Sequence, residues 1–233
     1  MAAANDQPAA LTRLSHLVIS GGSDAQAVLM ASERAAAEIQ GVADDEHRML
    51  FESGRLFLLG MWSLSQEDSG EADGYFTRSL ELAELSLSRS ESSEAHRRVS
   101  NALQQLLELR GLLFQMTEFR RALDAARRAV QLDSESPEAR MSLVSYLASA
   151  PSVAGGNRDE ALRQLERAEE LSAGMADAAD LEFLMAVWRA RLSARSGDRQ
   201  STASALAEAR AIYPESWLLS QAEADIRQDL ETL

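Results

Sequence analysis

The stretch FRRALDAARRAVQLD, residues 119–133, decides the fold class of this chain. Ala122, Ala126 and Ala129 recur at the three- and four-residue spacing that places side chains on one face of an α-helix. Small side chains on such a face let a neighbouring helix approach closely. The stretch therefore predicts a helix packed tightly against another helix, with Ala126 buried and Arg127 exposed.

The same small-residue face recurs three more times along the chain. It appears as Ala161, Leu165 and Ala168, as Thr202, Leu206 and Ala209, and more loosely as Ala72, Phe76 and Ser79. Helices of this kind end in an apolar residue followed by proline or glycine, at 132–137, 171–174 and 212–214. Because both residues stop a helix, the pattern predicts an array of helix-turn-helix units.

Composition agrees with an all-α fold. The chain has 233 residues, 45% of them hydrophobic, with only four prolines and 5% aromatic residues. Alanine, leucine, glutamate and arginine are abundant, and these residues lose little rotamer freedom in a helix. A chain of this length buries a sizeable core, so we expect one continuous domain.

The repeated units resemble the tetratricopeptide repeat (TPR) family. The residues that carry the resemblance are Leu56, Leu59, Gly60, Ala72 and Phe76, then Leu106, Leu109, Leu113, Phe119, Ala122, Ala126 and Ala129, and finally Gly197, Leu206, Ala209 and Pro214. The resemblance implies a TPR-like right-handed α-solenoid of about four helix-turn-helix units. It places Leu106, Leu109 and Leu113 on one first helix, and Arg110 stands there where a small residue is expected.

The units depart from the regular 34-residue period of the family. Ala161 follows Ala122 by 39 residues, and Thr202 follows Ala161 by 41. The third unit contains an insertion at 150–161, where we expect Pro151 to end a helix, Gly155 and Gly156 to turn with positive φ, and Asn157 or Asp159 to cap the next helix. A similar insertion occurs in bacterial TPR-like proteins, including lipoproteins associated with TRAP transporters, which indicates a bacterial origin.

The boundaries follow from these patterns. We predict a disordered N-terminus at 1–7, an N-terminal helix pair at 8–42, TPR-like repeats at 43–214 and a C-terminal capping helix at 215–233. Glycine and serine at 21–23 separate the first two helices, and Asp24 is expected to cap the second. A capping helix is expected because the last repeat of a solenoid otherwise exposes an apolar face.

Charge and residue types exclude several functions. The formal net charge is −14, and all 23 basic residues are arginine. Such an acidic chain repels phosphate backbones and anionic lipids, so we expect neither nucleic-acid binding nor membrane insertion. The chain has no cysteine and no visible signal peptide at Met1. The expected compartment is the cytoplasm, or the periplasm if a leader was removed.

Catalytic and metal-binding patterns are missing from the sequence. His16, His47 and His96 lie far apart, without partners at triad or metal-ligand spacing. Gly155 and Gly156 lack the strand and lysine of a phosphate-binding loop. We therefore expect no catalytic residue, no metal site and no cofactor.

Binding is the function that the family resemblance implies. First helices of TPR repeats line a concave groove, and this face holds Phe57, Met61, Leu64, Leu107, Phe114 and Met141, with Ser145, Val187 and Arg191 beyond them. The residues that clamp a peptide carboxylate in chaperone-binding members are absent. We expect a protein or peptide partner in an apolar groove, with homo-oligomerisation possible. Two alternatives stay open: the N-terminal helices cover these residues, or the chain is a periplasmic accessory protein of a TRAP-type system that holds a small apolar ligand.

Overall fold

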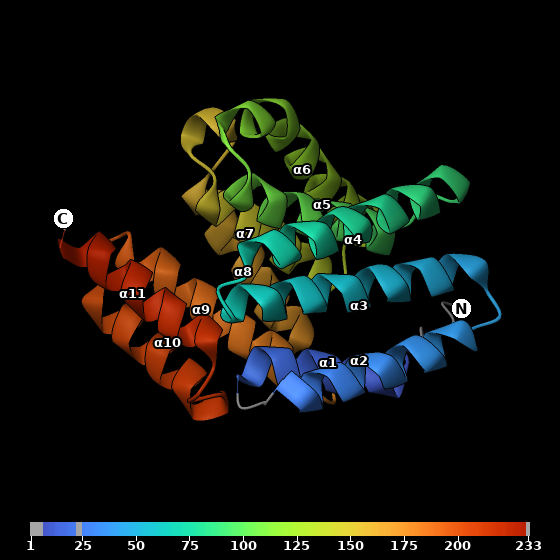
Figure 1. Ribbon diagram of the computed structural model, residues 1–233. Helices are drawn as coiled ribbons and strands as arrows, with labels where there is room; N and C mark the ends of the chain where they lie inside the picture. Colours follow the sequence, from blue (N-terminus) through green and yellow to red (C-terminus); the bar gives the residue numbers. More distant parts are fainter. Residues whose placement is uncertain (1–6, 22–24, 232–233) are drawn as a thin grey trace.

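A computed structural model describes residues 7–21 and 25–231, and α-helices joined by short turns make up nearly all of this part (Figure 1). The helices are α1 (Ala9–Ser20), α2 (Ala25–Gln40), α3 (Asp45–Ser65), α4 (Ser69–Arg89), α5 (Ser93–Leu109), α6 (Leu112–Leu132), α7 (Pro137–Ser149), α8 (Arg158–Ser172), α9 (Ala179–Ala194), α10 (Arg199–Ile212) and α11 (Trp217–Glu231), with a 3-10 turn η1 (Ser152–Ala154). The described ranges contain no strand. The predicted all-α class is confirmed. Asp24, the predicted cap, and residues 1–6 of the predicted disordered N-terminus lie outside the described ranges.

The helices pack as consecutive pairs, α3 with α4, α5 with α6, α7 with α8 and α9 with α10. The pair α1–α2 precedes these four units, and α11 follows them. The small-residue faces predicted for the second helices are buried with one exception, Leu206, which is only partly buried. Leu165 and Thr202 are buried, and the remaining residues have no exposed surface: Ala122, Ala126, Ala129, Ala161, Ala168, Ala72, Phe76, Ser79 and Ala209. Arg127 lies on the opposite, exposed face of α6, so the predicted register of these helices holds.

Close approach between α3 and α4 depends on small and hydroxyl side chains. A Cβ atom at Gly60 would lie 2.6 Å from Cε1 of Phe76, whose ring is fully buried against α3. Ser53 Oγ donates to the Ser79 carbonyl at 2.8 Å, and Ser79 Oγ donates to the Ser53 carbonyl at 2.9 Å. These reciprocal hydrogen bonds satisfy buried polar groups at the helix contact.

The boundary between α5 and α6 differs from the prediction. Leu113 was expected on the first helix of its unit, but α5 ends at Leu109 and Leu113 lies on α6 with 83% of its surface exposed. Arg110 leaves the helix with φ −99° and ψ 149°. Its guanidinium donates to both carboxylate oxygens of Asp73 on α4, at 2.6 and 2.7 Å, and to Thr77. This bidentate pair holds the extended backbone at Arg110, so the second helix begins earlier than the sequence pattern indicates.

The first helices α5 and α7 run parallel to one another, and so do α9 and the last helix α11. Ser142 and Ser145 of α7 donate to Asn101 and Gln104 of α5, both across 41 residues. Arg191 and Arg195 of α9 donate to Asp225 and Asp229 of α11, both across 34 residues. A constant offset along two helices means that they advance in the same direction, and the offset is longer between α5 and α7 because α6 between them has 21 residues, whereas α10 between α9 and α11 has 14.

The insertion at 150–161 folds largely as predicted. Gly155 has φ +91°, and the Asn157 side chain accepts from the Glu160 amide at the start of α8. Gly156 does not have the predicted positive φ. A glycine is needed there because a Cβ atom would lie 1.8 Å from the Ala150 carbonyl oxygen. The buried hydroxyl of Tyr146 lies 2.7 Å from the Phe119 carbonyl and 2.8 Å from that of Ala154, which ties α7 to α6 and to η1.

Helix α1 brings the two ends of the array together. It packs against α3, α9 and α11, and the two halves of the chain meet beside it in Figure 1. Ser216 Oγ donates to the Ile19 carbonyl at 2.6 Å, and Ser15 Oγ donates to Asp180 at 2.8 Å. A Cβ atom at Gly21 would lie 2.3 Å from the Glu215 carbonyl oxygen. The N-terminal helix pair therefore packs against the last units, through α1, and closes the array on that side.

None of the helices within the described ranges combines the length and the apolar character needed to cross a membrane.

Candidate functional site

A cavity of about 550 Å³ lies at the centre of the closed array. Its walls come from α1, α3, α5, α7, α9 and α11. The second helices α4, α6, α8 and α10 contribute none of the residues that line it. The cavity is thus a property of the whole chain, since both terminal helices complete it.

One part of the wall is apolar. It is built by Val18, Ile19, Phe57, Leu58, Met61, Leu64, Met141, Leu181, Leu184, Val187, Trp188, Trp217 and Leu218. These residues come mainly from α1, α3, α9 and α11. Phe57 also stacks on Phe76 of α4 with ring centroids 5.4 Å apart, which ties this wall to the core of the first unit.

A polar stripe on α5 and α7 contributes a different surface to the same cavity. Asn101, Gln104 and Glu108 follow Arg97 at three- and four-residue spacing, so they lie on one face of α5. Ser142 Oγ donates to Asn101 Oδ1 at 2.6 Å, and Gln104 Nε2 donates to the Ser142 carbonyl at 3.1 Å.

These hydrogen bonds do not use every polar group of the stripe. Within the described part of the chain, the amide nitrogen of Asn101 and the whole side-chain amide of Gln105 have no hydrogen-bond partner, although both residues line the cavity. The stripe can therefore donate to, and accept from, a bound molecule.

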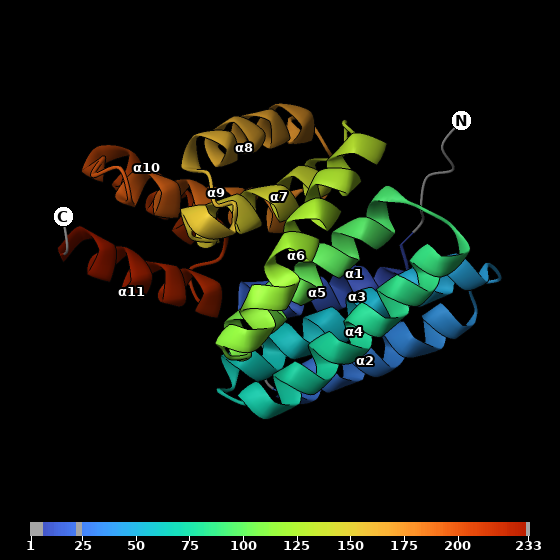
Figure 2. The same cartoon turned by 90° about the horizontal axis from the view of Figure 1, so that it is seen from above.

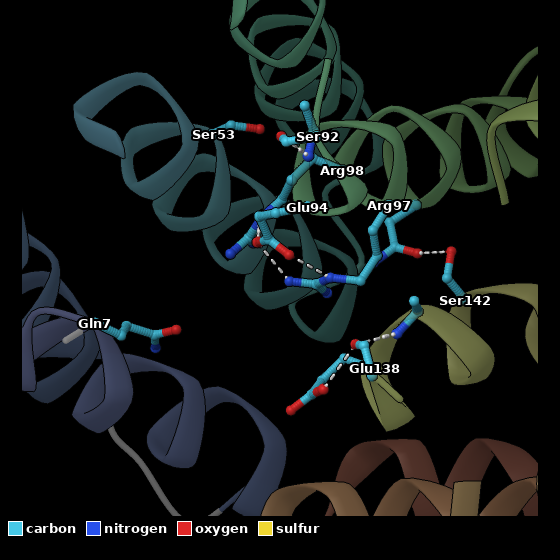
Figure 3. A network of polar contacts seen from close by, with 12 residues as sticks. Gln7, Ser53, Ser92, Glu94, Arg97, Arg98, Glu138 and Ser142 are labelled. Carbon is cyan, nitrogen blue, oxygen red and sulfur yellow. Dashed lines mark hydrogen bonds and ion pairs between the residues drawn. The ribbon is translucent and has the colours of Figure 1, made fainter. Parts of the chain in front are cut away.

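One end of the polar stripe is held by a charge cluster at the start of α5. Figure 3 shows the Glu94 carboxylate beside Arg97 and Arg98 of the same helix. Arg97 donates to both Glu94 oxygens at 2.7 and 2.6 Å, and Arg98 donates at 2.6 Å. Burial opposes the charged carboxylate, but the two guanidinium groups outweigh it and lower the pKa of Glu94 to about 2. The cluster fixes the Arg97 side chain at the cavity wall.

The opposite end lies between α9 and α11. Arg191 donates to Asp225 at 2.8 Å, and its guanidinium lies 5.1 Å from the ring centroid of Trp188. Arg191 Nε and Trp217 Nε1 are buried donors without a hydrogen-bond partner. A buried unpaired donor costs about 1–3 kcal/mol, so an acceptor on a bound molecule that reached either nitrogen would be stabilised there.

The structure gathers most of the predicted groove residues around the cavity. Phe57, Met61, Leu64 and Met141 line it, as do Ser145, Val187 and Arg191. Two predicted residues lie elsewhere. Leu107 lines a second, smaller cavity. Phe114 belongs to α6, where it packs under the Arg110 guanidinium at 4.9 Å and does not line either cavity, because α5 ends before it.

The sequence analysis predicted neither the polar stripe nor the contribution of the terminal helices α1 and α11 to the cavity wall. Arg97, Asn101, Gln104 and Glu108 recur at helical spacing, and that pattern was visible in the sequence. No comparable signal marks Val18 or Trp217. Their place at the cavity depends on the contact between α1 and α11, which lie at opposite ends of the chain.

The histidines take part in structural contacts. His47 Nδ1 lies 2.9 Å from Asp44, the residue that caps α3, and His96 Nε2 lies 3.1 Å from Glu91. His16 Nδ1 lies 3.1 Å from the Tyr213 hydroxyl, which donates to Asp180 at 2.8 Å. Within residues 7–21 and 25–231, no three His, Asp or Glu side chains gather as they would around a metal ion.

No family profile matches the sequence, and no curated protein matches it either. Solved structures with a similar fold do exist. TTC0263, described as a thermophilic TPR protein of Thermus thermophilus, is 17% identical, with 94% of this chain and 97% of that chain covered at a TM-score of 0.56. YrrB, described as a TPR protein with an unusual peptide-binding site, is 20% identical, with 94% and 93% covered at a TM-score of 0.40. In fold, this chain is a TPR-like helical repeat protein.

Proposed function

We propose that this chain is a non-catalytic interaction module that holds a peptide segment of a protein partner in its central cavity. The observation that carries the proposal is the pairing of an apolar wall with a polar stripe in one cavity. An extended peptide presents alternate side chains to one side, and its backbone amide and carbonyl groups need hydrogen-bond partners. Phe57 and Met61 suit apolar side chains of such a peptide, while Asn101 and Gln105 suit its backbone.

Size and energy are consistent with a short segment. A volume of about 550 Å³ falls within the usual range for ligand-binding clefts and cavities, roughly 300–1,000 Å³. Each large apolar side chain that enters contributes about 1.5–3 kcal/mol before ordering costs. Two or three anchors therefore contribute about 3–9 kcal/mol before those costs, and a micromolar Kd, which corresponds to about 8 kcal/mol, also requires hydrogen bonds to the polar stripe.

A small apolar ligand is the second candidate, and the closure of the array by α1 favours it. The polar stripe argues against a purely apolar molecule. Such a ligand would cover the free amides of Asn101 and Gln105 without pairing them, and an unpaired buried amide costs about 1–3 kcal/mol in proteins. A peptide pairs these groups, so it is the better fit.

A blocking variant tests the proposal. Gln221 of α11 is exposed and lines the cavity, so Gln221→Trp places a bulky ring in part of the cavity without removing a core side chain. Gln200→Trp on the exposed face of α10 is the matched control. A random displayed-peptide library is selected on the wild-type chain, and the enriched peptides are measured by calorimetry on all three proteins.

We expect peptides that bind the wild type and Gln200→Trp alike and lose at least about tenfold in affinity on Gln221→Trp. Equal binding to all three proteins, or no enrichment, would contradict the proposal. An apolar dye that binds the wild type but not Gln221→Trp, in the absence of any peptide binder, would favour the small-ligand function.

A further inference from the structure

The molecule has a second cavity, of about 320 Å³, outside the closed array. It lies between α5, α6, α7 and the η1 turn, which are neighbours in the middle of Figure 2. Its apolar lining includes Leu107, Leu112, Met116, Phe119 and Val153.

Exposed apolar side chains concentrate at this cavity. Leu112 is 70% exposed, Met116 65% and Val153 92%, and Leu113 beside them is 83% exposed. Contiguous exposed apolar surface of this kind marks interaction sites. The early start of α6, set by the Arg110–Asp73 pair, is what places Leu112 at this cavity.

The second cavity adjoins the central one. Three residues line both cavities: Gln104 and Glu108 on α5 and Ser149 at the end of α7. A segment that leaves the central cavity past these residues reaches the exposed apolar surface next. The two cavities therefore form one path along α5.

Glu108 gives this path its chemical preference. It is the only charged residue among those described as lining the second cavity, and its carboxylate has no hydrogen bond or salt bridge within the described ranges. Desolvation by the surrounding helices raises the pKa of Glu108, although part of its side chain stays exposed. The charged groups that face it are Arg191, which is paired with Asp225, and Asp225 itself. A cation at this point would find an unoccupied partner, and the net charge of −14 attracts cationic chains.

We infer that the bound peptide carries a lysine or arginine between two apolar anchors: one anchor fills the central cavity, the basic residue pairs with Glu108, and the second anchor occupies the surface of Leu112, Met116 and Val153. This inference rests on the proposed function and adds the class of peptide. An apolar surface alone would not select a charge, whereas the unpaired carboxylate at the junction does.

Charge reversal at Glu108, where the two cavities meet, tests the inference. Glu108→Arg is compared with Glu33→Arg, a control on the exposed face of α2 that changes the net charge equally. Displayed-peptide selections are repeated on both variants. We expect the wild type and Glu33→Arg to enrich Lys or Arg flanked by apolar residues, and Glu108→Arg to enrich Asp or Glu at that position. An unchanged preference on Glu108→Arg would overturn the inference.

A second variant, with a matched control, tests the exposed apolar surface at the second cavity. Met116→Ser removes an exposed side chain at the second cavity, and Met30→Ser removes an exposed one on α2. We expect Met116→Ser to weaken the selected peptides about tenfold and Met30→Ser to leave them unchanged. If Met116→Ser and Glu108→Arg have no effect while Gln221→Trp abolishes binding, the central cavity binds peptide and the extended path is wrong. A dimer in sedimentation that Met116→Ser dissociates would assign the surface to a second copy of the chain and overturn the inference.

Discussion

The contact between Gly60 and Phe76 gives a quantitative test of the packing between α3 and α4. Replacing a helical glycine with alanine normally stabilises a helix by about 1 kcal/mol. At Gly60 the new Cβ would lie 2.6 to 2.8 Å from three ring atoms of Phe76, where carbon atoms prefer about 3.5–4.0 Å. The buried ring must move by about 1 Å, and overpacking of this kind costs about 1–3 kcal/mol. Gly60→Ala should therefore be neutral or destabilising by up to about 2 kcal/mol.

Gly74→Ala on α4 is the matched control, because nothing lies within 4 Å of its new Cβ. This variant should gain about 0.5–1 kcal/mol. The helix-propensity gain is common to both variants, so their difference reports overpacking alone, about 1–3 kcal/mol. Urea unfolding followed by circular dichroism measures it. If Gly60→Ala were as stable as Gly74→Ala, the close packing described for the first unit would be wrong.

Three further perturbations probe other contacts. The pKa of Glu94 falls from 4.5 in the unfolded chain to about 2 in the folded protein, so its negative charge stabilises the fold above pH 4.5. This contribution, up to about 3 kcal/mol, is lost as the pH falls towards 2. The gap in unfolding free energy between wild type and Glu94→Gln should accordingly narrow over that range in urea titrations at stepped pH. Gly21→Ala should detach α1, since φ is +78° and the Glu215 carbonyl blocks the new Cβ; faster amide exchange at residues 9–20 is expected, and unchanged exchange would refute the closure. Tyr146→Phe should cost about 1–2 kcal/mol in thermal melts, because the buried hydroxyl that bonds the Phe119 and Ala154 carbonyls is lost; an unaltered melting temperature would show that water replaces it.

Local sequence patterns were enough to predict the second helices. The face of Ala122, Ala126 and Ala129 is buried because helical spacing alone puts these residues together. The end of α5 was not predictable in the same way. It depends on Arg110 pairing with Asp73, 37 residues earlier, and no local pattern records a contact across two helices.

The candidate site was only partly predictable for a related reason. Phe57 and Met61 were assigned to the concave face from the repeat pattern, and both line the cavity. Val18 and Trp217 line it as well, because α1 packs on α3 and α9, α11 packs on α9, and the two helices meet although they lie at opposite ends of the chain. The position of such residues follows from the closure of the array, which single-repeat patterns do not describe.

Site-specific photo-crosslinking tests most directly whether the central cavity holds a peptide. Benzoylphenylalanine is placed at Gln105, which lines the cavity, or at Gln200 on the outer face of α10. Each protein is irradiated with peptides enriched on the wild-type chain, and the products are mapped by mass spectrometry. The account predicts crosslinked peptide at position 105, its loss when Gln221→Trp obstructs the cavity, and none at position 200. Crosslinking at position 200 with none at position 105 would place the partner outside the cavity and contradict the account.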